Sequence, residues 1–290
     1  MQAHSAARAE QSLDDLGRHA ETAAQAAGPS IEFLGRLGYA AKGIVYLVVG
    51  GLAVQTAMGS GGQTTDKQGA LAHIAQLPFG KVLLGILIVG LLGYALWQGL
   101  RAALDADNKG SDAKGIFTRL IYAGIAAVYV GFSVSAMQLL FRGDGGQGSS
   151  EKTQGWTAWL MSQPFGPWLV ALAGLAVIGN GFAQLYRAFK SDLTDDLHLT
   201  DVGAEHSELV TRIGRAGYAA RGVAFLMIGG FLVGAAWHHN PSEAQGLDGI
   251  LATLAAQPFG PYLLGAVALG LAAYGLFALV EARYRRMVLD

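Results

Sequence analysis

The chain contains no cysteine, few prolines and few charged residues. Without cysteine, disulfides, thiolate metal sites and cysteine nucleophiles are excluded, and the redox compartment stays undetermined. Charged residues make up 14% of the 290 residues, against roughly 25% in an average soluble chain. Hydrophobic residues make up 52%, the mean hydropathy is +0.36 and the formal net charge is −1. This composition argues against an ordinary soluble domain, and the net charge argues against a nucleic-acid partner.

The seven prolines mark segment boundaries. Five of them lie in or directly after three copies of a Pro-Phe-Gly triplet, at residues 78–80, 164–166 and 258–260. Each triplet opens an apolar stretch, and a second apolar stretch begins 42 to 45 residues upstream at a basic residue. The chain is therefore a threefold repeat of a unit that contains two apolar stretches.

Each apolar stretch is long enough to cross a bilayer. A hydrocarbon core of roughly 30 Å needs about 20 residues of helix, and backbone polar groups in lipid must be satisfied within the helix. The sequence thus predicts an all-α polytopic membrane protein with six transmembrane helices, at about 36–58, 80–104, 117–141, 165–189, 214–237 and 259–283.

The repeats must all run in the same direction, because each contains an even number of spans. We therefore expect three parallel two-helix repeats in a pseudo-threefold bundle, and not the inverted repeats of many secondary transporters. The predicted units are an N-terminal tail and three repeats, at residues 1–30, 31–110, 111–195 and 196–290.

A short amphipathic segment precedes each triplet and starts at a Gln-Gly pair. The pairs occupy residues 68–69, 154–155 and 245–246. In the third copy the apolar residues follow the spacing of one helix face. The pattern predicts a short helix in the interface, with its apolar side toward the lipid or the bundle.

Lysine and arginine are distributed unevenly between the two sides of the predicted spans. One side, which holds both termini and the linkers between repeats, receives fourteen of them, and the other side receives four. Because positive residues stay cytoplasmic, we expect both termini in the cytoplasm. The first 30 residues lack the apolar core of a cleavable signal, so the first span would serve as the uncleaved targeting signal.

Several stretches resemble one family of bacterial membrane proteins. The leading helices of the first and third repeats read RLGYAAKG at 36–43 and RAGYAARG at 215–222, and the third repeat continues with QPFGP, ALGLAAYG and ARYRR. This set resembles proteins built from repeats of the domain of unknown function numbered 1206, over residues 36–286. The resemblance implies a multi-pass protein of the bacterial inner membrane with six helices, and it implies no activity.

Two basic residues lie inside the predicted spans. Lys42 and Arg221 occupy equivalent positions, six residues or about 9 Å inside the leading arginine of their repeats. Charge within a membrane suggests function by default, whereas snorkelling toward the cytoplasmic headgroups is the simpler alternative. A structural pair between Arg221 and Glu281 is an intermediate case. The second repeat has Ile125 at this position.

Polar amides form the second group of candidates. Asn180 lies in the middle of the fourth span, where the other repeats have Tyr94 and Tyr274, while Gln98 and Gln184 share a register nearer the cytoplasm. Such groups tie helices together or contact a solute. With the polar residues of the third span they could line a hydrated path.

No catalytic or cofactor motif is present. The acidic linker with its histidines at residues 192–206 matches no known metal spacing and is expected to be a solvated loop. We expect no cofactor and no metal site, and the sequence does not predict an enzyme.

Two function classes remain. The first is a structural or interaction role in the membrane, with lipids and a possible membrane-protein partner or second copy of the chain as contacts. The alternative is a conduit for a small solute or ion along the pseudo-threefold axis. A hydrated cavity lined by Asn180 and the glutamines would distinguish them.

Overall fold

The computed structural model describes residues 28–61, 64–104, 112–142, 148–190 and 204–284. These residues form helices and no strand, which confirms the predicted all-α class. The predicted N-terminal tail up to residue 27 and most of the acidic linker lie outside them.

Six long helices match the six predicted spans. Each is long and apolar enough to cross a membrane. They are α2 (Gly28–Ala57), α4 (Gly80–Leu104), α5 (Ala113–Arg142), α7 (Gly166–Lys190), α8 (Ala204–His238) and α10 (Gly260–Tyr284).

Short helices lie between the two long helices of each repeat, where the sequence predicts them. They are α3 (Lys67–Gln76), α6 (Ser149–Met161) and α9 (Leu247–Ala255), the last preceded by a 3-10 turn, η2 (Pro241–Glu243). Helices α3 and α9 turn their apolar side into the bundle, because Leu71 and Leu251 are almost fully buried. Helix α6 is more exposed, and its Trp156 and Trp159 face outward.

The Pro-Phe-Gly triplet forms the turn between each short helix and the long helix that follows. Its phenylalanine is left-handed in all three copies, with φ of 61°, 60° and 62° at Phe79, Phe165 and Phe259. A side chain on the glycine would collide with backbone carbonyls of the short helix; Gly80, for example, faces Ile74 and Ala75. The repeated sequence is therefore the signature of one sharp helix–helix corner.

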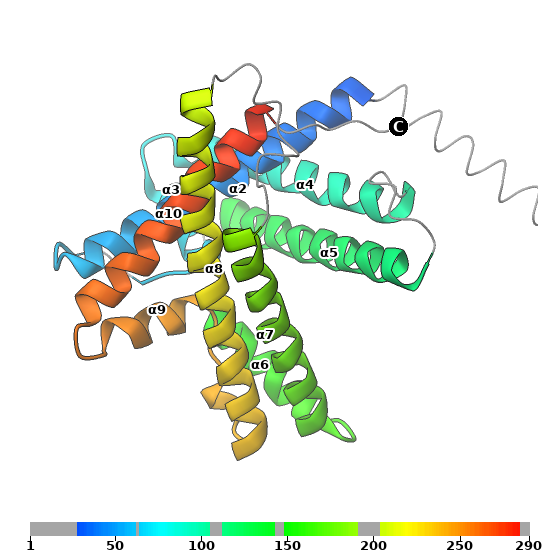
Figure 1. Cartoon of the computed structure of the whole chain (residues 1–290), viewed down its shortest axis with the longest axis vertical. Coiled ribbons are helices and arrows are strands. Elements are labelled where there is room, and N and C mark those ends of the chain that lie inside the picture. The colour runs from blue at the N-terminus through cyan, green and yellow to red at the C-terminus, as the bar shows by residue number, and fades with distance from the viewer. Residues whose placement is uncertain (1–27, 62–63, 105–111, 143–147, 191–203, 285–290) are drawn as a thin grey trace, which may run out of the picture.

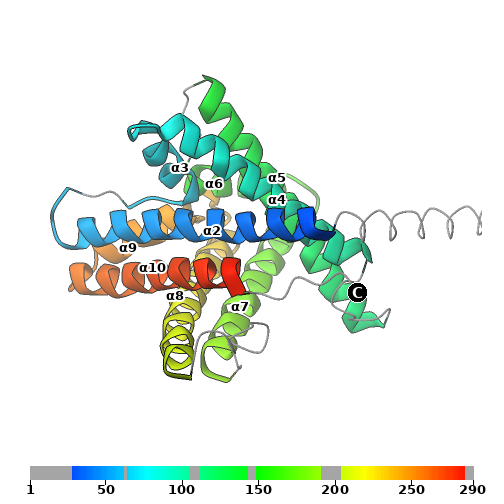
Figure 2. The same cartoon turned by 90° about the horizontal axis from the view of Figure 1, so that it is seen from above.

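The long helices are arranged in a ring. The second long helix of each repeat packs against the first long helix of the next, so α4 lies on α5, α7 lies on α8 and α10 returns to α2 (Figures 1 and 2). This cyclic order is the one that the predicted pseudo-threefold arrangement requires.

Glycines bring the backbones together in two of these three seams. In the α10–α2 seam a Cβ on Gly43 would lie 2.8 Å from the carbonyl oxygen of Gly275. In the α7–α8 seam the equivalent residue, Gly222, faces Leu185 and Gly181 in the same way. Close backbone approach through small residues is the usual basis of helix packing in membranes.

The second repeat differs from the other two. In the first repeat α2 crosses α4 where Gly38 packs against Tyr94. In the third repeat α8 crosses α10 where Gly217 packs against Tyr274. The second repeat has Ile121 at the glycine position.

Helices α5 and α7 consequently form no comparable packing over the residues that the structure describes, and they diverge in Figure 1. In α5 and α7 only 17% and 22% of the residues of the apolar span are buried, whereas the other four long helices bury 33–56% of theirs. The ring is therefore open between α5 and α7, because a branched side chain replaces the glycine that the crossing needs.

The crossing of α8 and α10 offers a direct test of this packing. A Cβ on Gly217 would lie 2.5 Å from the Tyr274 Cα, whereas a Cβ on Gly230 of the same helix would meet nothing within 4 Å. We predict that Gly217→Ala lowers the free energy of unfolding by about 1–3 kcal/mol through overpacking.

Thermal unfolding of the purified protein in detergent measures the effect. The matched control Gly230→Ala should be neutral or slightly stabilising, because alanine favours helix more than glycine does. Equal effects at both positions would contradict the assigned crossing.

Candidate functional site

Six tyrosines gather where α2, α4, α5, α8 and α10 meet. Their rings form two groups in contact: Tyr39, Tyr94 and Tyr129 with centroid distances of 5.0 and 4.5 Å, and Tyr46, Tyr274 and Tyr218 with 4.9 and 5.5 Å. Tyrosine combines an apolar ring with a polar hydroxyl, so this centre of the bundle is filled but not apolar.

Lys42 lies between the two groups of rings. Its side chain is 6% exposed, so it is enclosed by the bundle and does not snorkel out of it. The ammonium forms an ion pair with Glu281 of α10, at 3.8 Å. It also lies over three rings at 4.8–5.2 Å from their centroids: Tyr39, Tyr94 and Tyr274. Charge pairing and cation–π contacts together offset part of the cost of burial.

Arg221, the equivalent residue of the third repeat, is half-buried, and its guanidinium points to the same rings. Its guanidinium lies 4.2 Å from the Tyr274 ring centroid and 5.5 Å from that of Tyr46. Its Nε is buried without a hydrogen-bond partner. Glu281, which the sequence suggested as the partner of Arg221, forms its ion pair with Lys42 of the first repeat.

A third cation, Lys67, reaches the same place from α3. Its ammonium lies 5.1 Å from the Tyr46 ring centroid and 5.6 Å from that of Tyr129. Tyr46 is eleven residues before the end of α2 at Ala57, roughly 16 Å along the helix. Helix α3 therefore places a charge inside the bundle.

Sequence reasoning counted Lys67 among the residues outside the spans. The equivalent positions are Thr153 and Ala244, so the repeat pattern carried no signal for it.

The three cations face one carboxylate. Within the described residues, neither Lys67 nor Arg221 forms an ion pair, and Glu281 is bound to Lys42. The centre of the bundle thus carries an excess of positive charge.

A small cavity of about 10 Å³ lies in this cluster. That volume is about what one water-sized sphere needs. Its walls contain two lysines, two tyrosines and four apolar side chains: Lys42, Lys67, Tyr46, Tyr129, Val45, Leu71, Leu91 and Phe132.

The polar amides predicted as site residues lie elsewhere. Asn180 is exposed on α7, and Gln98 is buried, where it accepts a 2.8 Å hydrogen bond from Arg101. Gln184 is 6% exposed and its Oε1 has no partner. None of the three lines the cavity. Asn180 faces outward because the second repeat does not close around it.

A polar cluster near Lys67 connects the short helices of the second and third repeats. Asp248 of α9 accepts hydrogen bonds from the hydroxyls of Ser149 and Ser150 in α6, at 2.8 and 2.6 Å. Asp66 caps α3 by accepting from the amides of Gln68 and Gly69. Burial raises the pKa of the Asp66 carboxyl, and the nearby charge of Asp248 adds to the rise.

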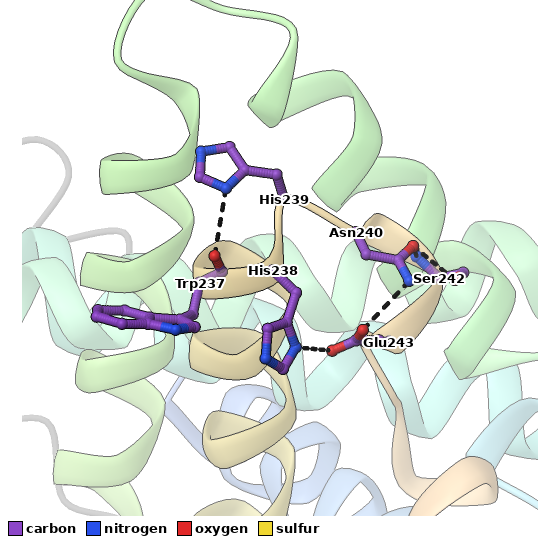
Figure 3. A network of polar contacts seen from close by, with 6 residues as sticks. All are labelled: Trp237, His238, His239, Asn240, Ser242 and Glu243. Carbon is purple, nitrogen blue, oxygen red and sulfur yellow. Dashed lines mark hydrogen bonds and ion pairs between the residues drawn. The ribbon is translucent and has the colours of Figure 1, made fainter.

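The turn after α8 holds a separate, exposed network, drawn in Figure 3. The ring of His238 lies 2.7 Å from the carboxylate of Glu243, which also accepts from Asn240. The hydrogen bond to His238 lowers the pKa of Glu243. Among the described residues no three histidines or carboxylates are grouped as metal ligands.

Fold and site define a multi-pass helical membrane protein of three repeats with a buried group of cations and tyrosines. Three segments match the family described as Domain of Unknown Function (DUF1206), at residues 37–105, 120–191 and 216–285. The chain belongs to this family, as its sequence motifs indicated.

A relative is known from Bacillus subtilis (strain 168). The chain is 36% identical over 259 residues to its "Uncharacterized protein YxxB". The matched region covers 89% of this chain and 93% of that protein. No solved structure matches the chain.

The cap of α3 gives a testable consequence. The pKa of Asp66 is higher in the folded protein than in the unfolded chain, so the folded protein binds the proton more tightly. Above that pKa the carboxyl is ionised, and the buried charge lowers the free energy of unfolding. Asp66→Asn keeps the cap without the charge and should preserve or raise the unfolding temperature at neutral pH.

Asp66→Ala should instead lower the free energy of unfolding by about 0.5–2 kcal/mol, through loss of the cap. Thermal unfolding at pH 7 distinguishes the two variants. The cap assignment is wrong if alanine and asparagine behave alike.

Proposed function

We propose that the protein provides a passage for a small solute along its pseudo-threefold axis, and that the passage is closed in this conformation. The observation that carries the proposal is the connected series of charged and aromatic side chains through the middle of the bundle. Intramembrane charge marks solute or ion pathways more often than it serves stability alone.

The series can be followed from contact to contact. Lys67 lies over Tyr46, which also contacts Arg221, and Arg221 lies over Tyr274. Lys42 contacts the same Tyr274 ring and then Glu281. Glu281 is three residues from the end of α10 at Tyr284, so the series runs from the short helix α3 to the end of the bundle that holds both ends of the described chain.

The tyrosine rings would act as the gate. They occupy the space between the cations and leave a cavity of about 10 Å³, too small for a continuous water column. Because these rings are buried and packed against one another, opening would require displacement of the helices, which takes microseconds or longer.

The orientation follows from the distribution of lysine and arginine. We place the protein in the bacterial inner membrane with both termini in the cytoplasm. Lys67 then approaches the site from the outside, and Glu281 lies nearer the cytoplasm.

Flux through proteoliposomes tests the passage. We expect the purified protein to release a trapped small electrolyte faster than protein-free liposomes do. Tyr46→Ala should increase the rate several-fold, because it removes a ring that fills the constriction. Tyr262→Ala is the control, since Tyr262 is 79% exposed on α10. Rates no higher than those of protein-free liposomes, for both the native protein and Tyr46→Ala, would refute the passage.

A second candidate is the interaction role, favoured by the open side of the ring. Helices α5 and α7 are the least buried spans, and the faces of Gly124, Gly131 and Gly179 meet nothing within 4 Å. A long helix of a second copy could supply the contact that Ile121 prevents within the repeat.

Cysteine cross-linking tests this role without background, because the chain has no cysteine. Ile121→Cys should give disulfide-linked dimers in native membranes under mild oxidation. Leu276→Cys is the control, because Leu276 is similarly exposed but lies on α10, away from the open side. The dimer is excluded if Ile121→Cys stays monomeric or links no better than Leu276→Cys.

A further inference from the structure

We propose that α7 pairs with α7 of a second copy of the chain, about a two-fold axis along the membrane normal, and that Asn180 lies at the centre of this contact. The proposal does not depend on the passage. It rests on the interaction role, and it names the helix, the residue and the symmetry of that contact.

Asn180 is a polar side chain exposed in the middle of an apolar span. It lies fourteen residues after Gly166 and ten residues before Lys190, the two ends of α7. Its side chain forms no hydrogen bond within the described residues. At this depth of a bilayer no water reaches the amide, and an amide without a partner in hydrocarbon costs free energy. The position therefore calls for a polar partner from outside this copy of the chain.

Small residues surround Asn180 on one exposed face of α7. Successive positions are three, four and three residues apart, which keeps them on one side of a helix. We call this the Asn180 face; its residues are Ala173, Ala176, Asn180 and Ala183, all exposed. Leu175 and Phe182, the large residues just before two of the alanines, lie about 100° around the helix from them. A row of small residues allows another helix backbone to approach closely, which is the usual basis of helix association in membranes.

The equivalent face lies inside the bundle in the other two repeats. In α4 its residues are all buried: Leu87, Gly90, Tyr94 and Trp97. In α10 three of the four are buried: Gly270, Tyr274 and Phe277. Both faces pack on the first long helix of their own repeat, as where Gly270 meets Ala220. In the second repeat this face is uncovered, and alanine and asparagine replace its large residues. Contact with lipid alone does not call for small or polar residues, whereas a closely packed helix does.

The chemistry of Asn180 selects a second copy as the partner. Copies of one chain insert into the membrane in the same orientation, so a two-fold axis along the normal places two α7 helices parallel. A residue at this axis meets its own counterpart at the same depth. An amide carries both a donor and an acceptor, so two Asn180 side chains satisfy each other, as asparagine pairs do in parallel coiled coils. Arg187, near the end of α7, reaches the headgroups, which keeps the two like charges solvated.

Single cysteines identify the contacting face, because the chain has no cysteine of its own. In native membranes treated with a membrane-permeant oxidant, Ala176→Cys and Ala183→Cys should form disulfide-linked dimers. Leu175→Cys and Phe182→Cys are the matched controls, since they lie at the same depths but outside the Asn180 face. They should link several-fold less. The proposal is overturned if the controls link as well as the alanine positions do.

The amide is tested in the Ala176→Cys background. Asn180→Leu should lower the yield of linked dimer by roughly 3- to 30-fold, the range expected for one interhelical polar contact. Asn180→Gln retains an amide and should keep most of the yield. The unfolding temperature in detergent should not fall in Asn180→Leu, because the side chain has no partner within one copy. Undiminished linking in Asn180→Leu overturns the proposal.

The pattern of linked positions separates this pair from the other proposals. Links at Ile121→Cys without links at Ala176→Cys support a dimer through α5 and refute the α7 pair. Links at neither position refute both the pair and the interaction role. Links at Ala176→Cys that depend on Asn180 support the pair whether or not proteoliposomes show flux.

Discussion

The fold depends on how closely its helix backbones can approach. In lipid there is no hydrophobic force between helices, so packing and polar contacts must hold the bundle together. Glycines at the seams and crossings, such as Gly43 and Gly217, let the backbones touch. Where Ile121 replaces the crossing glycine, the ring stays open. One residue per repeat thus decides whether the two-helix unit closes.

Closure of the first and third repeats creates the charged centre. It brings Lys42 and Arg221 from α2 and α8 to the same group of tyrosines, and α3 adds Lys67. Aromatic faces stabilise desolvated cations, but they do not neutralise them. Ile125 in place of a third equivalent base limits the repulsion. The remaining excess of charge is a feature that stability alone does not explain, since buried ions are costly even when paired.

Much of this architecture could be predicted from the sequence. Hydropathy, the Pro-Phe-Gly triplets and the repeat alignment predicted six spans in the right places, because length and backbone satisfaction constrain them strongly. The alignment of Ile121 with Gly38 and Gly217 also indicated the open side. This signal can be interpreted only once the structure shows that the two glycines lie at helix crossings.

The site was less predictable. Lys42 and Arg221 were found from their depth alone, but the partner of Glu281 depends on the contact between the first and last repeats. Lys67 could not be found, because nothing in a short amphipathic segment indicates that its first residue reaches Tyr46. Asn180 was expected either to tie helices together or to contact a solute, and it is exposed, since side-chain direction depends on whether α5 and α7 close.

The variant Ile121→Gly tests the central claim most directly, because it gives the second repeat the glycine that the other two repeats have at their crossings. Spin labels on α5 and α7 report the separation of these two helices. The account predicts that the separation is shorter in Ile121→Gly than in the native protein, because the two helices can then pack together. An unchanged separation in a folded variant would contradict it.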